Sequence, residues 1–274
     1  MRIVSLVPSI TEALCMLGLQ DSLVGITDYC LHPAPIVSEK HRLGGTKNPR
    51  LRDVIEARPD FVIVNTDENR RQTFDQLQAA GLNVLVTQTD SLDEVEQAWT
   101  QLGEATGTAP AARQNREAIA VARAFNREVL RGVEPLPALV AIWRDPWMAC
   151  GHGTYMESVL RECGFRNVME SADRKWIRIA LHGDDKGDQV AWDVLRSRRG
   201  VVLLPSEPYR FEEPDRDPFT ASGISRDRVC LVDGVLLSWW LSRTVEALKY
   251  FRMLRLALAD GRAEEGRDPK YGNH

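Results

Sequence analysis

The chain has 274 residues and a formal net charge of −4, which argues against a general nucleic-acid binder, because such proteins usually present a basic face. Hydrophobic residues make up 43% and charged residues 27%, a balance typical of a soluble globular protein with one large domain or two smaller lobes. No apolar run approaches the roughly 18 residues that a membrane span needs.

The N-terminal segment predicts where the protein is found. Residues 3–7 form a short apolar run directly after Arg2, too short for the apolar region of a signal peptide, and we interpret them as a strand. The cysteines are odd in number, widely spaced and without a CxxC pair, which fits a reducing compartment. They are Cys15, Cys30, Cys150, Cys163 and Cys230. The sequence as written therefore predicts a cytoplasmic protein, or a periplasmic one if it is a trimmed mature form.

The first hundred or so residues alternate short apolar runs with helical segments. We expect strands at 3–7, 23–26, 61–64 and 84–86, and helices at 11–18, 51–57, 65–80 and 92–103. Ser9 at or near the N-cap and Glu12 three residues later have the spacing of a capping box. The runs at 61–64 and 84–86 lack polar alternation, as in parallel sheets covered on both faces. An N-terminal α/β lobe over residues 1–108 follows.

A long helix is predicted for residues 109–132. No Gly or Pro interrupts the sequence between Ala111 and Arg131, while Pro110 suits a first helical turn and Gly132 a C-terminal end. Its one narrow apolar stripe is Ile119, Ala122, Phe125, Val129 and Leu130. At this length the helix would be about 30 Å long. We expect it to link two lobes and to leave a cleft between them.

After this helix the pattern of the first half repeats. We expect strands at 138–142, 201–204 and 229–232, and helices at 155–164, 193–197 and 239–258, with Thr154 as an N-cap. The repeated order indicates an internal duplication, with a second α/β lobe over residues 133–260, and we expect the tail at 261–274 to be disordered. The predicted fold class is α/β, with two similar lobes of mainly parallel sheet joined by one long backbone helix.

Ligands in open parallel sheets bind beyond the carboxyl ends of the strands. In this chain the predicted strands are followed by residues 8–9, 28–32, 65–69, 143–147, 205–210 and 233. If the two lobes face each other, these loops would line one cleft. The sequence therefore predicts a binding site between the lobes.

Several segments, taken in order, are similar to those of a known family. These are residues 3–12 (IVSLVPSITE), the GGT at 44–46, RPDFVI at 58–63, and ESVL at 157–160 with Cys163 and Gly164. Together they resemble the Fe/B12-type (class III, helical-backbone) periplasmic substrate-binding proteins, and the vitamin B12-binding members most of all, over about residues 2–258. The resemblance implies a cobalamin, haem or siderophore ligand held between two lobes, and delivery to an ABC permease. We expect a monomer without a covalent cofactor.

The chain departs from this family at several positions. The receptors normally carry a signal peptide, which this sequence lacks. Where the B12 binders have Trp residues in two N-terminal loops, this chain has Lys47 and the pair at 65–66. The acidic permease-docking positions fall near Arg52 and Trp192, with Asp53 and Asp193 adjacent. The identity of the chelate and the permease partner therefore stay open.

Aromatic and charged side chains near the strand ends are the candidate ligand contacts. Trp143, Trp147 and Trp240 could stack on a flat macrocycle, burying about 150–250 Å² each, or could instead pack in a core. Lys47, Arg144, Arg210 and Arg243 could bind carboxylates or phosphates, with solvated surface charge as the alternative. The full set of predicted ligand-binding residues is Ser9, Tyr29, Lys47, Asn65, Glu68, Trp143, Arg144, Trp147, His152, Trp240 and Arg243.

Other candidates have structural alternatives. His152 precedes a helix N-terminus, which favours anions as much as metals. Glu68 lies where residues 67–69 would begin a helix, so capping is the ordinary explanation. Cys30 and His32 could supply one soft and one borderline metal ligand, or could be a buried thiol and a loop histidine.

The sequence favours binding over catalysis. The motifs GxGxxG, GxxxxGK[ST], GxSxG and HExxH do not occur. Together with the family resemblance, this predicts a binding protein for a cobalamin-like corrinoid or another metal chelate, such as haem or a siderophore, and leaves open whether it serves an ABC importer. The alternative is a cytosolic two-lobed enzyme, such as a nucleotide-sugar transferase or a metal chelatase.

Overall fold

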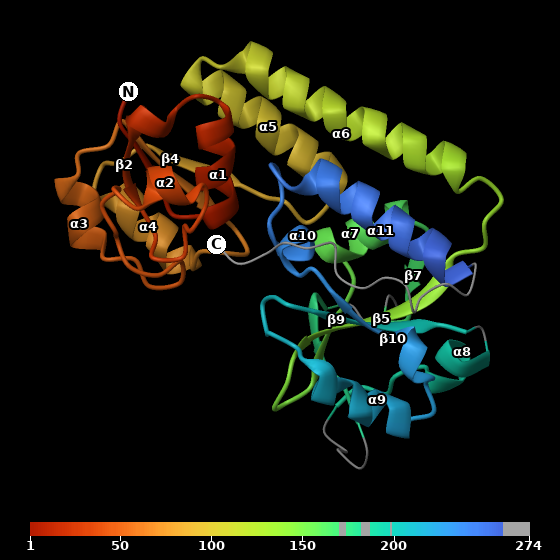
Figure 1. Cartoon of the computed structure of the whole chain (residues 1–274). Helices are drawn as coiled ribbons and strands as arrows, with labels where there is room; N and C mark the ends of the chain where they lie inside the picture. The colour runs from red at the N-terminus through yellow and green to blue at the C-terminus, as the bar shows by residue number, and fades with distance from the viewer. Residues whose placement is uncertain (170–173, 182–186, 198, 260–274) are drawn as a thin grey trace. The chain divides into compact units, whose positions relative to one another are not determined.

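The computed structural model describes residues 1–169, 174–181, 187–197 and 199–259 (Figure 1), and the tail predicted to be disordered lies outside them. The chain divides into two compact units. Unit 1 comprises residues 1–89, 93–118 and 239–242, and unit 2 comprises residues 90–92, 119–238 and everything from 243 onward. Among the described residues, no helix has the length and apolar character needed to cross a bilayer.

Unit 1 contains a parallel sheet. Its strands are β1 (Ile3–Ser5), β2 (Leu23–Ile26), β3 (Phe61–Asn65) and β4 (Val84–Thr87), in the order β2-β1-β3-β4. Every residue of β3 is buried, as its lack of polar alternation predicted. The same expectation for residues 84–86 is wrong, because Val84 and Leu85 are only partly buried and Val86 is 38% exposed. The core on the sheet includes Val4, Leu6, Val62, Val64 and Leu77.

The helices of unit 1 are α1 (Pro8–Met16), α2 (Ala34–Val37), α3 (Leu51–Glu56), α4 (Arg71–Ala79) and α5 (Leu92–Thr106), with a 3-10 turn at Gln20–Ser22. The predicted N-cap at Ser9 is wrong. Pro8 is already helical, the N-cap is Val7 without a side-chain hydrogen bond, and Ser9 is buried in the first turn. Proline at the first helical position explains the shift, since its missing N–H needs no partner there.

The predicted start of α4 at residues 65–69 is also wrong. Asn65 ends β3, and its Oδ1 accepts hydrogen bonds from the backbone N–H groups of Asp67 (2.9 Å) and Glu68 (3.3 Å). An asparagine side chain that binds the next backbone amides favours a turn over a helix. The helix therefore begins only at Arg71.

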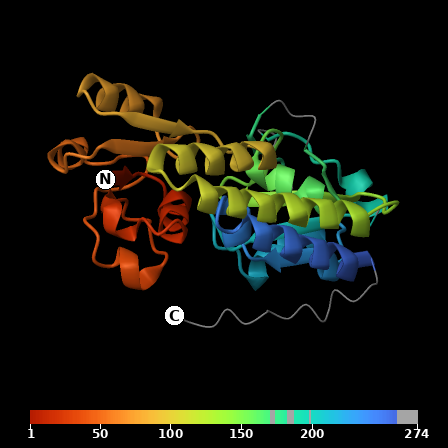
Figure 2. The same ribbon diagram turned by 90° about the horizontal axis from the view of Figure 1, so that it is seen from above.

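The long helix α6 (Ala109–Val129) confirms the predicted helix, and Gly132 just beyond it has the left-handed φ of +76° that glycine tolerates. The boundary between the two units falls within α6, which therefore contributes residues to both. In unit 1, α5 and α6 run side by side (Figures 1 and 2). They approach closely at Gly103, where a Cβ would lie 2.5 Å from that of Ala112.

Unit 2 repeats the sheet of unit 1 and adds to it. Strands β7 (Phe165–Asn167), β5 (Leu136–Trp143), β9 (Val201–Pro205) and β10 (Val229–Val232) pair in parallel in that order. This order corresponds to β2-β1-β3-β4 and confirms the prediction of two similar, mainly parallel α/β lobes. The sequence analysis missed β7. It also missed two short antiparallel strands, β6 (Met148–Cys150) and β8 (Trp176–Arg178), which extend the sheet from β5.

The helices of unit 2 are α7 (Tyr155–Glu162), α8 (Trp192–Ser197), α9 (Asp217–Ala221), α10 (Val235–Ser238) and α11 (Thr244–Ala259), with 3-10 turns at Glu213–Arg216 and Arg226–Arg228. Thr154 caps α7 as predicted, since its side chain accepts from the N–H of Glu157 at 3.2 Å. Figure 2 shows α11 alongside the second half of α6, where Asn126 donates to the carbonyl of Leu248 and accepts from Arg252.

The helix predicted for residues 239–258 is confirmed from Thr244 onward, but its predicted start at residue 239 is wrong. The chain leaves helical geometry between α10 and α11, and Leu241 has a φ of +68°, which a bulky side chain rarely adopts. Residues 239–242 belong to unit 1, where the Trp239 ring meets His32 edge-on at 5.4 Å and the Ser242 hydroxyl donates to Glu12 at 2.5 Å. These contacts replace the hydrogen bonds of a continuous helix.

Candidate functional site

The strongest candidate site in unit 2 lies beyond the ends of β5 and β9. Because these neighbouring strands are parallel, their carboxyl ends meet at one edge of the sheet, and the segments that follow them lie together. A cavity of about 330 Å³ occurs there. It is lined by Arg144, Tyr209, Arg210, Glu212, Pro214 and Asp215.

Aromatic rings border this cavity. The ring of Trp143, the last residue of β5, is 44% exposed and meets Tyr209 edge-to-face at 5.5 Å. Trp147 is placed differently, because it stacks on Phe211 at 5.7 Å and meets Phe219 at 5.0 Å within the core of unit 2. Of the two tryptophans predicted to contact a ligand here, Trp143 presents an exposed ring, while Trp147 is mainly a packing residue.

A buried carboxylate orients Arg144. The guanidinium Nη1 donates to Asp215 Oδ1 at 2.5 Å, and the other oxygen of Asp215 accepts the backbone N–H of Glu212 at 2.7 Å. The hydrogen bond that Arg144 donates to Asp215 raises the pKa of Arg144 above its ordinary value, so the arginine stays charged. Its side chain is still 41% exposed, and the highly exposed Arg210 lies on the same cavity wall. Arg210 in turn lies 3.9 Å from Glu212, so each guanidinium of this wall has an acidic neighbour in the same wall. Their remaining N–H groups could still bind a carboxylate or phosphate.

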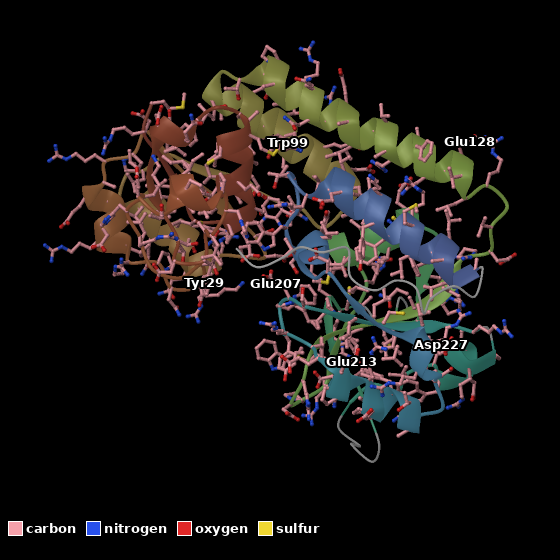
Figure 3. All side chains as sticks on the ribbon, viewed as in Figure 1. Tyr29, Trp99, Glu128, Glu207, Glu213 and Asp227 are labelled. Atoms are coloured by element: carbon pink, nitrogen blue, oxygen red, sulfur yellow. The ribbon has the colours of Figure 1, made fainter. Side chains whose placement is uncertain are left out.

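Three of the predicted residues of unit 1, Tyr29, Cys30 and His32, lie in the loop after β2. Tyr29 is 62% exposed and labelled at the surface in Figure 3. The thiol of Cys30 is buried against the hydroxyls of Thr11 (3.1 Å) and Thr27 (3.2 Å), and burial raises its pKa. Arg42 fixes the loop by donating to the carbonyls of Thr27 and Cys30.

These contacts bear on the predicted metal pair. His32 lies in the same loop as Cys30, but its ring packs against Trp239. Across residues 1–169, 174–181, 187–197 and 199–259, no group of three or more His, Cys, Asp or Glu side chains could hold a metal ion. The assignment of Cys30 and His32 as metal ligands therefore stays a prediction, and both side chains have structural contacts of their own.

The loop after β3 is closed by its own polar groups. Asn65 is fully buried, and its Nδ2 donates to the carbonyl of Thr87 (3.2 Å) and to the hydroxyls of Thr87 and Thr89 (3.2 and 3.1 Å). The ammonium group of exposed Lys47 donates to the carbonyl of Asp67. Burial raises the pKa of the Glu68 carboxyl, and the nearby charge of Lys47 opposes that rise.

The remaining predicted residues are dispersed. Ser9 and Trp240 are buried in unit 1, and Arg243 of unit 2 lies 3.8 Å from Glu246. His152 is exposed at the start of α7, with its Nδ1 3.4 Å from Glu157 Oε2. Of the predicted residues in unit 2, Trp143 and Arg144 adjoin the cavity, and the sequence analysis did not single out Tyr209 or Asp215. The sequence indicates Tyr209 only by its position, because it is an aromatic residue four positions beyond the end of β9.

The repeated α/β sheet and the cavity beyond the strand ends, with Tyr209 and charged side chains in its wall, are typical of a ligand-binding protein of the two-lobed α/β class. The sequence profile of the periplasmic binding protein family matches residues 3–203. The chain therefore belongs to that family, as the resemblance to Fe/B12-type receptors indicated.

Curated relatives agree with this assignment. A vitamin B12-binding protein from Photorhabdus laumondii subsp. laumondii is 22% identical over 180 residues, 66% of this chain and 65% of that protein. An uncharacterized ABC transporter substrate-binding lipoprotein from Bacillus subtilis is 29% identical over 162 residues, 54% of this chain and 51% of that protein. The matched part thus spans between about half and two thirds of these relatives' lengths.

Solved structures confirm the fold. The periplasmic haem-binding protein RhuT from Roseiflexus sp. RS-1, in apo form, superposes with a TM-score of 0.74 at 19% identity, covering 95% of this chain and 98% of that one. The periplasmic vitamin B12-binding protein BtuF of Vibrio cholerae gives a TM-score of 0.75 at 18% identity, covering 96% and 98%. At these identities the likeness establishes the architecture and leaves the ligand to be argued from the residues.

Proposed function

We propose that this protein is the substrate-binding component of an ABC importer and that its ligand is a metal chelate, either a cobalamin-like corrinoid, haem or a siderophore. The family match and the names of the relatives support binding over the two-lobed enzyme considered as the alternative. The observation that carries the proposal is the cavity of about 330 Å³ with Trp143 and Tyr209 at its border and Arg144 held by Asp215 in its wall.

The proposed roles follow from the chemistry of each side chain. The exposed face of Trp143 and the ring of Tyr209 would cover part of a flat macrocycle. Arg144 and Arg210 would bind acidic substituents at its edge. Binding is the whole mechanism, because an importer's receptor only has to select and release its ligand. Exposed Tyr29, Lys47 and His152 are further proposed contacts.

The test is a titration of purified protein with cobinamide, cobalamin, haemin and ferric siderophores, followed by absorbance and calorimetry. We expect at least one to bind, and Trp143→Ala to weaken that binding about tenfold, which corresponds to about 1.4 kcal/mol. Trp176→Ala is the matched control, because Trp176 is similarly exposed (42%) but, among the described residues, its ring does not contact Tyr209 or another residue of the cavity wall as Trp143 does. Absence of binding below about 1 mM for every chelate, where the free energy is only about −4 kcal/mol, would refute the proposal.

The surface also suggests where a permease would dock. Trp192 packs against Phe219, so the neighbouring Asp193 is the exposed acid at that position, with 96% of its side chain accessible and one oxygen 2.5 Å from Arg196 Nη2. In unit 1, Asp53 is bound to Arg50 at 2.7 Å, and Arg52 is exposed and paired with Glu56. We propose Asp193 as a docking residue. Asp193→Lys should abolish stimulation of the cognate permease's ATPase while chelate binding is retained; unchanged stimulation would contradict the assignment.

We propose an extracytoplasmic location in place of the cytoplasmic one expected from the N-terminal segment. The family is described as periplasmic, and the relative from Bacillus subtilis is described as a substrate-binding lipoprotein. The five free cysteines are compatible with it. Burial raises the pKa of Cys150 and of Cys163 to about 12, and that of Cys230 to about 11, so little reactive thiolate forms. Fractionation of the source cells would test the location.

A further inference from the structure

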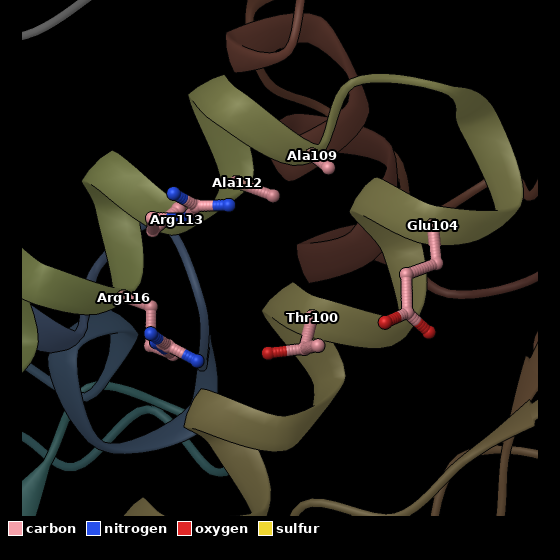
Figure 4. Close-up of a pocket in the computed structure, with 6 residues that line it drawn as sticks. All are labelled: Thr100, Glu104, Ala109, Ala112, Arg113 and Arg116. Carbon is pink, nitrogen blue, oxygen red and sulfur yellow. The ribbon is translucent and has the colours of Figure 1, made fainter.

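A second hollow lies in unit 1, between α5 and α6, away from the strand ends. Its volume is about 440 Å³. The side chains that line it are Thr100 and Glu104 from α5 and Ala109, Ala112, Arg113 and Arg116 from α6 (Figure 4). We call it the α5–α6 groove. Ala109 and Ala112 keep it open because their side chains are small, while the close approach of the helices at Gly103 fixes its floor.

The charges in this groove are unbalanced. Farther along α6, Arg123 and Arg127 both reach Glu162 (3.3 and 2.7 Å), and Arg131 reaches Glu128 (2.5 Å). Arg113 and Arg116, in contrast, make no hydrogen bond or ion pair with any residue that the structure describes. Residues three apart share one helix face, so two like charges of α6 face the same hollow, against the single carboxylate of Glu104 on α5.

The orientation of these groups suits an incoming oxyanion. Figure 4 shows the guanidinium of Arg116 and the hydroxyl of Thr100 turned toward each other across the groove, with Arg113 extending over it. A guanidinium fork binds two oxygens of a phosphoryl group at once. Two forks on one face can therefore each take one phosphoryl group, and the groove has room for both.

We propose that the α5–α6 groove binds a phosphate-class anion, and that a diphosphate group fits it better than a single phosphate. The anion neutralises Arg113 and Arg116, and the Thr100 hydroxyl donates a third hydrogen bond. This site is separate from the chelate cavity of unit 2 and does not depend on the proposed function.

The experiment is calorimetric titration of the full chain with inorganic pyrophosphate, phosphate and malonate at constant ionic strength. We expect pyrophosphate to bind with a Kd below about 1 mM and more tightly than phosphate. The double variant Arg113→Gln/Arg116→Gln should lose at least about tenfold in affinity, and Thr100→Val about threefold. Without added anion, the double variant should unfold at the wild-type temperature or above, because a like-charge repulsion has been removed.

The matched control is Arg52→Gln/Arg131→Gln, which removes the same net charge at exposed arginines that already have acidic partners. The affinity of this control for pyrophosphate should stay within about twofold of wild type, a smaller change than the loss of at least about tenfold expected for Arg113→Gln/Arg116→Gln. No saturable pyrophosphate binding by wild type, or an equal loss in this control, overturns the proposal. Malonate binding as tightly as pyrophosphate overturns the phosphate assignment. Chelate binding is followed in parallel and should be the same in all variants.

Discussion

The edges beyond the strands of the two units share one topology and differ in chemistry. In unit 1, Asn65, Asn69 and Thr87 turn inward and bind one another and the backbone. In unit 2, Trp143 is exposed at the corresponding edge, and Arg144 lines a cavity there with 41% of its side chain accessible. The parallel sheet places loops at a common edge in both cases, and the side chains then decide whether that edge is closed or open.

The difference shows how one fold can use the same position for stability or for binding. A buried amide with every donor and acceptor satisfied holds backbone segments together, and leaves no group for a ligand. An exposed aromatic ring beside an oriented cation can contact a ligand through apolar surface and through charge. We therefore expect substitutions at the edge of unit 1 to lower stability, and exposed ones at the edge of unit 2 to lower affinity.

The largest expected effect separates the two tryptophans of unit 2. Trp147→Ala should lower the free energy of unfolding by about 3 kcal/mol, because it removes the packing against Phe211 and Phe219. Trp143→Ala, at an exposed ring, should lower it by less than about 1 kcal/mol. Urea unfolding of both variants measures this difference. Equal losses would mean that the exposed edge of unit 2 is structural after all.

The next effect tests the closed edge of unit 1. Asn65→Ala should destabilise the protein by about 2 kcal/mol, because buried partners at Thr87, Thr89 and the following turn lose their hydrogen bonds. Thr66→Ala, at the exposed neighbour, should stay within about 0.5 kcal/mol in the same urea titration. A stable Asn65→Ala variant with weakened chelate binding would instead restore Asn65 as the ligand contact predicted from the sequence.

A smaller effect concerns the charge at the open edge. Arg144→Gln should weaken binding of haemin, which carries carboxylates, about tenfold, and binding of cobinamide less than about twofold. Arg161→Gln is the matched control, since Arg161 is also paired with a buried carboxylate, Glu157, at 3.3 Å. Absorbance titrations with both chelates give the ratio. Equal weakening for the two chelates would show that Arg144 acts through packing rather than charge.

Much of the fold could be predicted because its signals are local. The apolar runs at 61–65 and 201–205 carry no polar alternation, and Thr154 precedes its helix with the usual capping chemistry. The errors arise where a distant or unusual contact prevails. Asn65 accepts hydrogen bonds from the following amides, so α4 begins later than predicted. Leu241 has a positive φ that interrupts helical geometry before α11, and no glycine at that position indicates this in the sequence.

The candidate site was less accessible from sequence. Trp143 and Trp147 lie four residues apart around one turn, and composition does not say which of them is buried. The proximity of Arg144 to Tyr209 and Asp215 results from the pairing of β5 with β9, across more than sixty residues of chain. A strand end indicates an edge, but the partners that complete a cavity come from the register of the sheet.

The smallest expected effect depends on pH and concerns Glu68 at the closed edge. Burial raises the pKa of this carboxyl above its ordinary value of 4.5, so the folded protein binds the proton more tightly than the unfolded chain. Stability should therefore fall as the pH rises through the interval between the two pKa values. Glu68→Gln removes the ionisation and should be more stable than wild type at pH 7, by less than about 1 kcal/mol.

The gain from Glu68→Gln should disappear near pH 4, where the wild-type carboxyl is largely protonated in both states. Urea unfolding at pH 4 and pH 7 measures it, with Glu39→Gln, at an exposed position, as a control expected to stay within about 0.5 kcal/mol at both. A loss of stability at pH 7 would mean that attraction to Lys47 outweighs the cost of burial. In that case Glu68 and Lys47 would both be charged at the edge of unit 1 and could bind a polar ligand. The edges of the two units would then differ less in their capacity to bind a ligand.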